Sequence, residues 1–222
     1  MSAVFTPHLD ILPPAQKRLW PELAATPSAF TLYGGTAIAL RLAHRTSVDF
    51  DFFSWSRFAP MSLMSEIPYL AAGTVVQSSA DTLTITLDRG GPVQLSFFGG
   101  LNLGQVASAD LVAGPQFKVA SLIDLAGTKA AVVTQRAEVR DYLDIHCLLT
   151  QTGITLSDML AAAAIIYGQQ FNPLISLKAI AYHDDPTLAE LPATVRADLR
   201  QAVAATDPNR LPILEAFRKR AD

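Results

Sequence analysis

Two aspartates separated by a single residue are the side chains best placed to do chemistry in this sequence. Asp49 and Asp51 lie in the segment Ser47–Phe53, where alternating apolar and polar residues predict a strand. Positions i and i+2 of a strand project from the same face, so the two carboxylates are expected to lie together. Ionised carboxylates this close repel each other unless a cation lies between them. The spacing therefore indicates a Mg²⁺ site, because Mg²⁺ binds carboxylate and phosphate oxygens and keeps some of its waters.

A strand with one solvent-facing side would show the same alternation, and aspartates on an edge strand would also discourage pairing with another chain. The preceding turn favours the metal site. Gly34-Gly35-Thr36 follows a predicted strand, Phe30–Tyr33, and opens a predicted helix, Ala37–Leu42. Glycines are common in ordinary turns, but backbone N–H groups at a glycine-rich turn and a helix N-terminus also bind anions, and Thr36 adds a hydroxyl. The combination predicts a site for a magnesium-bound triphosphate.

These segments resemble the AbiEii/AbiGii toxin-type nucleotidyltransferases, a family of the polymerase-β-like nucleotidyltransferase superfamily. The segments similar to the family's first motif are Gly34–Ala37, Leu42–Arg45 and Ser47–Phe53. A second similarity concerns the family's Lys…Arg…(Arg/Lys)-Asp-x-x-Asp helix, matched here by Asp124–Ala130, Arg136 and Arg140–Ile145. The resemblance extends from about Phe30 to about Leu149.

The resemblance implies an α+β fold, in which a nucleotidyltransferase-like mixed sheet flanked by helices is followed by a helical C-terminal region. The implied activity is Mg²⁺-dependent transfer of a nucleoside monophosphate from an NTP to a hydroxyl of an RNA or protein acceptor. The implied setting is the toxin half of a toxin–antitoxin or phage-defence pair, with a cognate antitoxin as partner.

The predicted catalytic residues and metal ligands are Asp49 and Asp51. The residues predicted to bind the nucleotide in the first half of the chain are Gly34, Gly35, Thr36 and Arg45. Arg45 is carried over from the family motif, where it would contact a phosphate or instead orient the aspartate strand.

A cationic strip is predicted on a long helix that ends at Gly153. At about 100° per residue, Lys129, Arg136 and Arg140 project within roughly 40° of one another. A solvated stripe with an Arg140–Asp144 pair would explain this spacing. Apolar residues on the same side of the helix instead favour a strip that lines the nucleotide cleft, where Lys129 would neutralise phosphate charge and the arginines would bind phosphates or carboxylates.

One position departs from the superfamily pattern, which usually has a third carboxylate on a later strand. The corresponding strand is Val93–Phe98, and Ser96 stands where an aspartate is expected. A serine hydroxyl is a poor Mg²⁺ ligand and no general base at neutral pH. Asp88, at the end of the preceding strand, is a substitute only if the hairpin register allows, and its surroundings resemble a turn. The sequence therefore predicts that nucleotide binding survives while transfer is slow or absent.

Composition fits one soluble protein of the cytoplasm. The 222 residues are half hydrophobic, the net charge is −3 and there is one cysteine, Cys147. A lone cysteine excludes an intramolecular disulfide framework, and the negative charge argues against a surface coated for nucleic acid. The apolar run Met159–Tyr167 is too short to cross a bilayer, so no membrane association is expected.

The predicted division places a nucleotidyltransferase-like core in residues 1–115 and a helical region that completes the nucleotide cleft in residues 116–222. Strands are expected near 74–77, 83–87 and 93–98, the last two as a hairpin, and helices from about Phe117 onward. The last two helices are delimited by Pro192 and Pro208. Two alternatives to the enzyme stay open: a catalytically impaired nucleotide-binding module, and a non-enzymatic interaction protein that retains only the scaffold.

Overall fold

The computed structural model describes residues 4–220 and divides the chain into two compact units. The first unit contains the chain up to Asn102 together with Ala109–Ala120, and the second contains Leu103–Ser108 and the chain from Ser121 onward. The predicted division at residue 115 differs from this one because Lys118 and Val119, beyond that residue, form a short strand that pairs with Thr31 and Leu32 of the first unit. Phe117 was expected to begin the helical region, but Lys118–Val119 is a strand.

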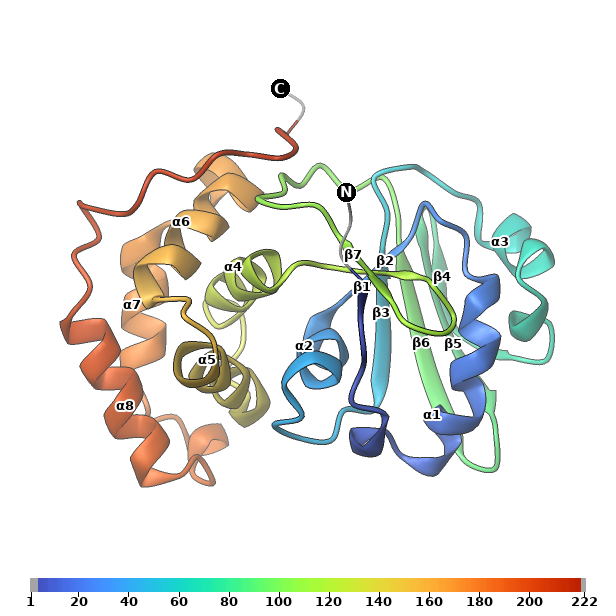
Figure 1. Ribbon diagram of the computed structural model, residues 1–222, viewed down its shortest axis with the longest axis horizontal. Coiled ribbons are helices and arrows are strands. Elements are labelled where there is room, and N and C mark those ends of the chain that lie inside the picture. The colour runs from blue at the N-terminus through green and yellow to red at the C-terminus, as the bar shows by residue number, and fades with distance from the viewer. Residues whose placement is uncertain (1–3, 221–222) are drawn as a thin grey trace. The chain divides into compact units, whose positions relative to one another are not determined.

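The first unit is built on a mixed sheet of eight strands among the described residues (Figure 1). Its order is β1-β7-β8-β2-β3-β6-β5-β4. The central pair β3–β6 is parallel, whereas β2–β3 and β5–β6 are antiparallel, so the predicted hairpin is confirmed. The strands are β1 (Val4–Phe5), β2 (Thr31–Tyr33), β3 (Asp49–Phe53), β4 (Thr74–Ser79), β5 (Thr82–Asp88), β6 (Pro92–Phe98), β7 (Asp110–Val112) and β8 (Lys118–Val119).

The two faces of β3 differ as the alternating sequence predicts. Phe50 and Phe52 are fully buried, whereas Asp49, Asp51 and Phe53 are partly exposed. Helix α1 (Pro14–Leu19) and the following 3-10 turn cover the apolar face, and α2 (Gly34–Leu42) lies on the opposite side of the sheet (Figure 1). Helix α3 (Pro60–Glu66) lies on the same side as α1. Burial of the large apolar side chains on one face leaves the carboxylates on the other.

The second unit consists of helices. They are α4 (Leu122–Val132), α5 (Val139–Gln151), α6 (Leu156–Tyr167), α7 (Pro173–Ala181) and α8 (Ala193–Ala204). Helices α4 and α6 pack closely, because an added Cβ at Gly127 would lie 2.9 Å from the Cβ of Ala162. Thr155 and Asp158 form a capping box that starts α6. The expected helix beyond Pro208 is wrong, since no helix lies between that residue and Arg220.

The long helix predicted to end at Gly153 is also wrong, because the chain turns between α4 and α5. The consecutive β-branched residues Val132, Val133 and Thr134 weaken the helix at this point. The Thr134 hydroxyl donates to the carbonyl of Ala131 at 2.8 Å and closes the turn.

None of the described helices is by itself long and apolar enough to cross a bilayer. Only the segments Val139–Gln151 and Leu156–Gln170 taken together, with a bend of 120° between them, reach the length and composition of a span.

Candidate functional site

The aspartate pair lies beside the glycine turn in the first unit. Asp51 is opposite Tyr33 on the neighbouring strand β2, and Gly34 follows Tyr33 as the first residue of α2. A Cβ added to Gly34 would lie only 2.7 Å from Oδ2 of Asp51, and the φ of Gly34 is +76°. Both facts require glycine here, because a side chain would collide with the carboxylate and strain the backbone. The Asp51 carboxylate therefore lies against the N-terminus of α2.

Thr36 holds the helix to the aspartate strand. Its side chain is buried, and its hydroxyl donates to the carbonyl oxygen of Asp49 and lies 2.8 Å from Oγ of Ser47. Ser47 has no predicted role in the sequence, and it precedes β3, which begins at Asp49. The first N–H groups of a helix have no partner within the helix, and no side chain caps α2. Anion binding at Thr36 would therefore use its backbone N–H.

Ser96 is the neighbour of Asp51 on the parallel strand β6. The register pairs Asp51 with Ser96 and Asp49 with Gln94, so these side chains share a face. The Ser96 hydroxyl is buried and lies 3.3 Å from that of Thr84 on β5. The expected position of the missing carboxylate is thus occupied by a neutral side chain beside Asp51.

Asp88 does not replace the third carboxylate. Its Oδ1 accepts the backbone N–H groups of Gly90 and Gly91 at 2.8 and 2.9 Å, which lowers the pKa of this carboxyl from its ordinary value. Asp88 is therefore the turn residue that its sequence surroundings indicated. Among residues 4–220, no group of three or more His, Cys, Asp or Glu side chains is arranged to hold a metal ion. The two aspartates fit a cation only if phosphate oxygens and water complete its coordination.

A cluster of aromatic side chains continues the aspartate face along β3. Tyr33 stacks on Phe53 with ring centroids 4.7 Å apart and an angle of 14° between the planes. Trp55 meets Tyr33 edge-on at 6.5 Å, and Phe98 meets Phe53 edge-on at 5.6 Å. The sequence carries one signal of this cluster, because Phe53 follows Asp51 at the i+2 spacing that places both on one face of β3.

Arg45 lies in the loop between α2 and β3. Its side chain is partly exposed, and its guanidinium donates to the carbonyl of Thr46 at 3.0 Å.

Lys129 lies in a buried ionic network within the second unit. Its Nζ is 2.6 Å from Oδ1 of Asp141 and 2.7 Å from Oδ2 of Asp144, and both carboxylates are fully buried. Nε of Arg136 donates to Oδ2 of Asp141 at 2.8 Å. Burial opposes ionisation of Asp141, but the charge of Lys129 and the hydrogen bonds from Arg136 and Lys129 outweigh it and lower the pKa of this carboxyl.

The predicted cationic strip is therefore divided between different elements. Lys129 is on α4, Arg136 is in the turn and Arg140 is on α5. Nε of Arg140 donates to Oε2 of Glu138 at 2.5 Å, in a pair whose side chains are both more than a third exposed. The Asp141 motif is evident in the sequence, but the neutralisation of Lys129 by its carboxylate is seen only in the structure.

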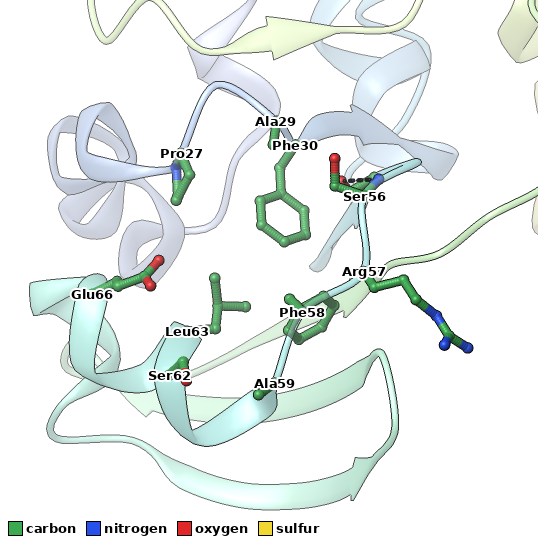
Figure 2. A pocket seen from close by; sticks show the side chains of 11 residues that line it. Pro27, Ala29, Phe30, Ser56, Arg57, Phe58, Ala59, Ser62, Leu63 and Glu66 are labelled. Carbon is green, nitrogen blue, oxygen red and sulfur yellow. Dashed lines mark hydrogen bonds between the residues drawn. The ribbon is translucent and has the colours of Figure 1, made fainter.

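The first unit also contains a cavity of about 230 Å³ (Figure 2). Phe30, Phe58 and Leu63 form much of its lining, with Ser56 and Arg57 near its edge. Phe30 precedes β2, whereas Gly34 follows it, so the cavity is at the other end of this strand. Phe30 also belongs to the opposite face, because it alternates with Thr31.

Comparison with known proteins gives consistent results. The chain matches the family described as nucleotidyl transferase AbiEii toxin of type IV toxin–antitoxin systems over residues 18–221. An uncharacterised protein of Aquifex aeolicus is 30% identical over 164 residues, which cover 70% of this chain and 74% of that protein.

Two solved structures share the fold. MenT4, a nucleotidyltransferase toxin of Mycobacterium tuberculosis, has a TM-score of 0.60 and 16% identity, covering 88% of this chain and 83% of its own. A candidate nucleotidyltransferase of H. pylori has a TM-score of 0.54 and 15% identity, covering 86% of this chain and 90% of its own. The α+β nucleotidyltransferase-like fold predicted from the sequence is thus confirmed. With its family match extending over nearly the whole sequence, this chain belongs to the AbiEii nucleotidyl transferase toxin family.

Proposed function

We propose that this protein transfers a nucleoside monophosphate from an NTP to a hydroxyl of an RNA or protein acceptor. One observation carries the proposal: the Asp51 carboxylate lies against Gly34 at the start of α2, with Asp49 on the same strand face. Carboxylates and unpaired helix N–H groups are the two kinds of ligand that a metal-bound triphosphate needs. This arrangement supports the proposal together with membership of the family.

Asp49 and Asp51 would hold the Mg²⁺ ion. When bound, Mg²⁺ would polarise the α-phosphate and stabilise negative charge on the leaving pyrophosphate. The backbone N–H groups of Gly35 and Thr36 would hold phosphate oxygens at the positive end of the α2 dipole. In the reaction, the acceptor oxygen bonds to the α-phosphorus, the bond to the β-phosphate bridging oxygen breaks, and the hydroxyl proton passes to water.

Lys129, Arg136 and Arg140 remain predicted phosphate contacts. The ionic network favours a structural role for Lys129. Its ammonium group already neutralises two buried carboxylates, so it would attract a phosphate less strongly than an unpaired lysine. Arg45 likewise remains a prediction, either as a phosphate ligand or as an orienting residue for β3.

The test of transfer is incubation with each α-labelled NTP, Mg²⁺, total RNA and cell extract. Label in RNA or protein, lost in the Asp49→Asn/Asp51→Asn variant, would support the proposal. Equal labelling by the variant would contradict the site.

A second function, nucleotide binding without turnover, is favoured by Ser96 beside Asp51. Within residues 4–220, no third His, Cys, Asp or Glu side chain joins Asp49 and Asp51 in a group that could hold a metal ion, and the neutral Ser96 is no base for the acceptor proton. Calorimetry that detects Mg²⁺-dependent NTP binding in a protein that labels no macromolecule would select this function. If no nucleotide binds, the remaining alternative is a non-enzymatic interaction protein that retains only the scaffold.

We also propose that the protein acts in the cytoplasm as a toxin with a cognate antitoxin. Growth arrest on expression, relieved by a neighbouring gene and absent in the Asp49→Asn/Asp51→Asn variant, would support this role. Arrest that persists in the variant would separate toxicity from the site.

A further inference from the structure

We infer that the aromatic cluster of Tyr33, Phe53, Trp55 and Phe98 is the platform on which the nucleobase of the bound NTP stacks. This inference rests on the proposed function and names the part of the substrate that the aspartate face recognises beyond the phosphates. All of the observations that carry it lie within the first unit.

The register of the sheet places the cluster beside the proposed phosphate site. Tyr33 is directly opposite Asp51, and Phe53 is two residues further along the same face of β3, about 7 Å away. On β6, Phe98 is opposite Phe53 and lies two residues after Ser96, on the same face of the sheet. A nucleotide whose phosphates lie at Gly34 and Asp51 would extend its base along the strand over these rings.

The exposure of the rings distinguishes this cluster from the aromatic residues of the core. On the opposite face, Phe52 and Phe97 stack with centroids 5.2 Å apart and are fully buried. Phe53, Trp55 and Phe98 are instead partly exposed, while Tyr33 beneath them is buried. Adjacent, partly exposed aromatic rings beside a polar site are a common feature of ligand-binding surfaces.

The chemistry of the cluster favours a base over other ligands. Bases stack on aromatic side chains with about 1–3 kcal/mol per base, and every base has a π-face. The residues in register with Phe53 on this face are Thr31 on β2, which is buried, and Phe98 on β6. Stacking would therefore dominate recognition of the base, and we expect the larger purine rings to bind more tightly than pyrimidines.

Trp55 allows a direct test, because the chain has only two tryptophans and the other, Trp20, is buried against Phe117. The full-length protein is titrated with ATP, GTP, UTP and inorganic tripolyphosphate in Mg²⁺, and tryptophan fluorescence is followed beside calorimetry. Purine NTPs should change the emission, whereas tripolyphosphate should bind without that change. In Trp55→Phe, which keeps a ring, NTP should bind without the fluorescence change.

Trp55→Leu should weaken NTP binding about 5- to 150-fold, the range to which ~1–3 kcal/mol converts at about 1.4 kcal/mol per tenfold. Its affinity for tripolyphosphate should stay unchanged. Met61→Ala, which removes an exposed apolar side chain from α3, is the matched control and should alter neither affinity. Circular dichroism verifies that each variant is folded.

The outcomes separate this inference from the proposed function. One outcome is that Asp49→Asn/Asp51→Asn binds NTP more weakly than the unmodified protein, whereas Trp55→Leu binds it equally well. In that case the stacking platform is wrong and the phosphate site is supported. If neither NTP nor tripolyphosphate binds, both are wrong. Equal loss of NTP and tripolyphosphate affinity in Trp55→Leu also overturns the platform, since it would show a general effect on the site.

Discussion

Replacement of Lys129 by methionine should destabilise the second unit strongly. The change keeps most of the side-chain volume but removes the charge that lies 2.6 and 2.7 Å from the carboxylates of Asp141 and Asp144. Both carboxylates are fully buried, and Arg136, which also pairs with Asp141, has 42% of its side chain exposed. Removing one partner of a buried ion pair costs about 3–5 kcal/mol because the other charge stays buried without compensation. We expect a loss of that size in the free energy of unfolding at neutral pH.

The stability difference between Lys129→Met and the unmodified protein should also depend on pH. The pKa of Asp141 is lowered in the folded protein, so its contribution to stability is present above the ordinary carboxyl pKa of about 3.9 and is lost as the pH falls through the folded value. In Lys129→Met burial still opposes ionisation of Asp141 while the attraction to lysine is gone, so we expect the pKa of this carboxyl to be higher than in the unmodified protein. Protonation then relieves the cost, so the stability difference between the two proteins should narrow from pH 7 toward pH 4.

Urea unfolding followed by far-ultraviolet circular dichroism measures both effects. Lys178→Met on α7 is the matched control, because Lys178 is exposed in the same unit and should change stability by less than about 0.5 kcal/mol. Equal unfolding midpoints for the two variants, or a difference that does not narrow in acid, would refute the reasoning. If Lys129→Met keeps its stability but loses more affinity for NTP than for nucleoside, Lys129 is the phosphate ligand predicted from the sequence.

Three further changes test the aspartate face. Gly34→Ala should abolish NTP binding and lower stability by about 1 kcal/mol or more, because its Cβ would meet Asp51 and its φ is positive; Gly153→Ala, which meets nothing within 4 Å, is the control for calorimetry and melting. Asp49→Asn with Asp51→Asn should remove Mg²⁺-dependent NTP binding and leave the melting temperature nearly unchanged, and unchanged affinity would contradict the site. Ser96→Asp should raise the rate of labelled NMP transfer, because the new carboxylate would lie beside Asp51, whereas Ser96→Asn should not. Robust transfer by the unmodified protein would contradict the predicted impairment.

Some features of the site could be predicted because they depend on contacts close in sequence. The i, i+2 spacing of Asp49 and Asp51 fixes their shared face once Phe50 and Phe52 are buried. The glycine turn and the helix that follows it are also local. Gly34 lies close to Asp51, as expected for a glycine turn beside the aspartate strand. This contact arises from the antiparallel pairing of Tyr33 with Asp51, which is a property of the sheet.

The sequence by itself determined the α+β class, the aspartate strand and the glycine turn, because alternation, helical periodicity and turn chemistry are encoded in neighbouring residues. Only the tertiary structure decided which distant groups meet. In the single predicted helix, Lys129 and Asp141 would be about 18 Å apart along the axis, but the turn after Val132 folds α5 back and brings them to 2.6 Å. The register likewise decided that Ser96 lies beside Asp51 and that aromatic rings follow it. Periodicity cannot reveal such pairings, because they depend on where the chain reverses and on which strand packs beside which.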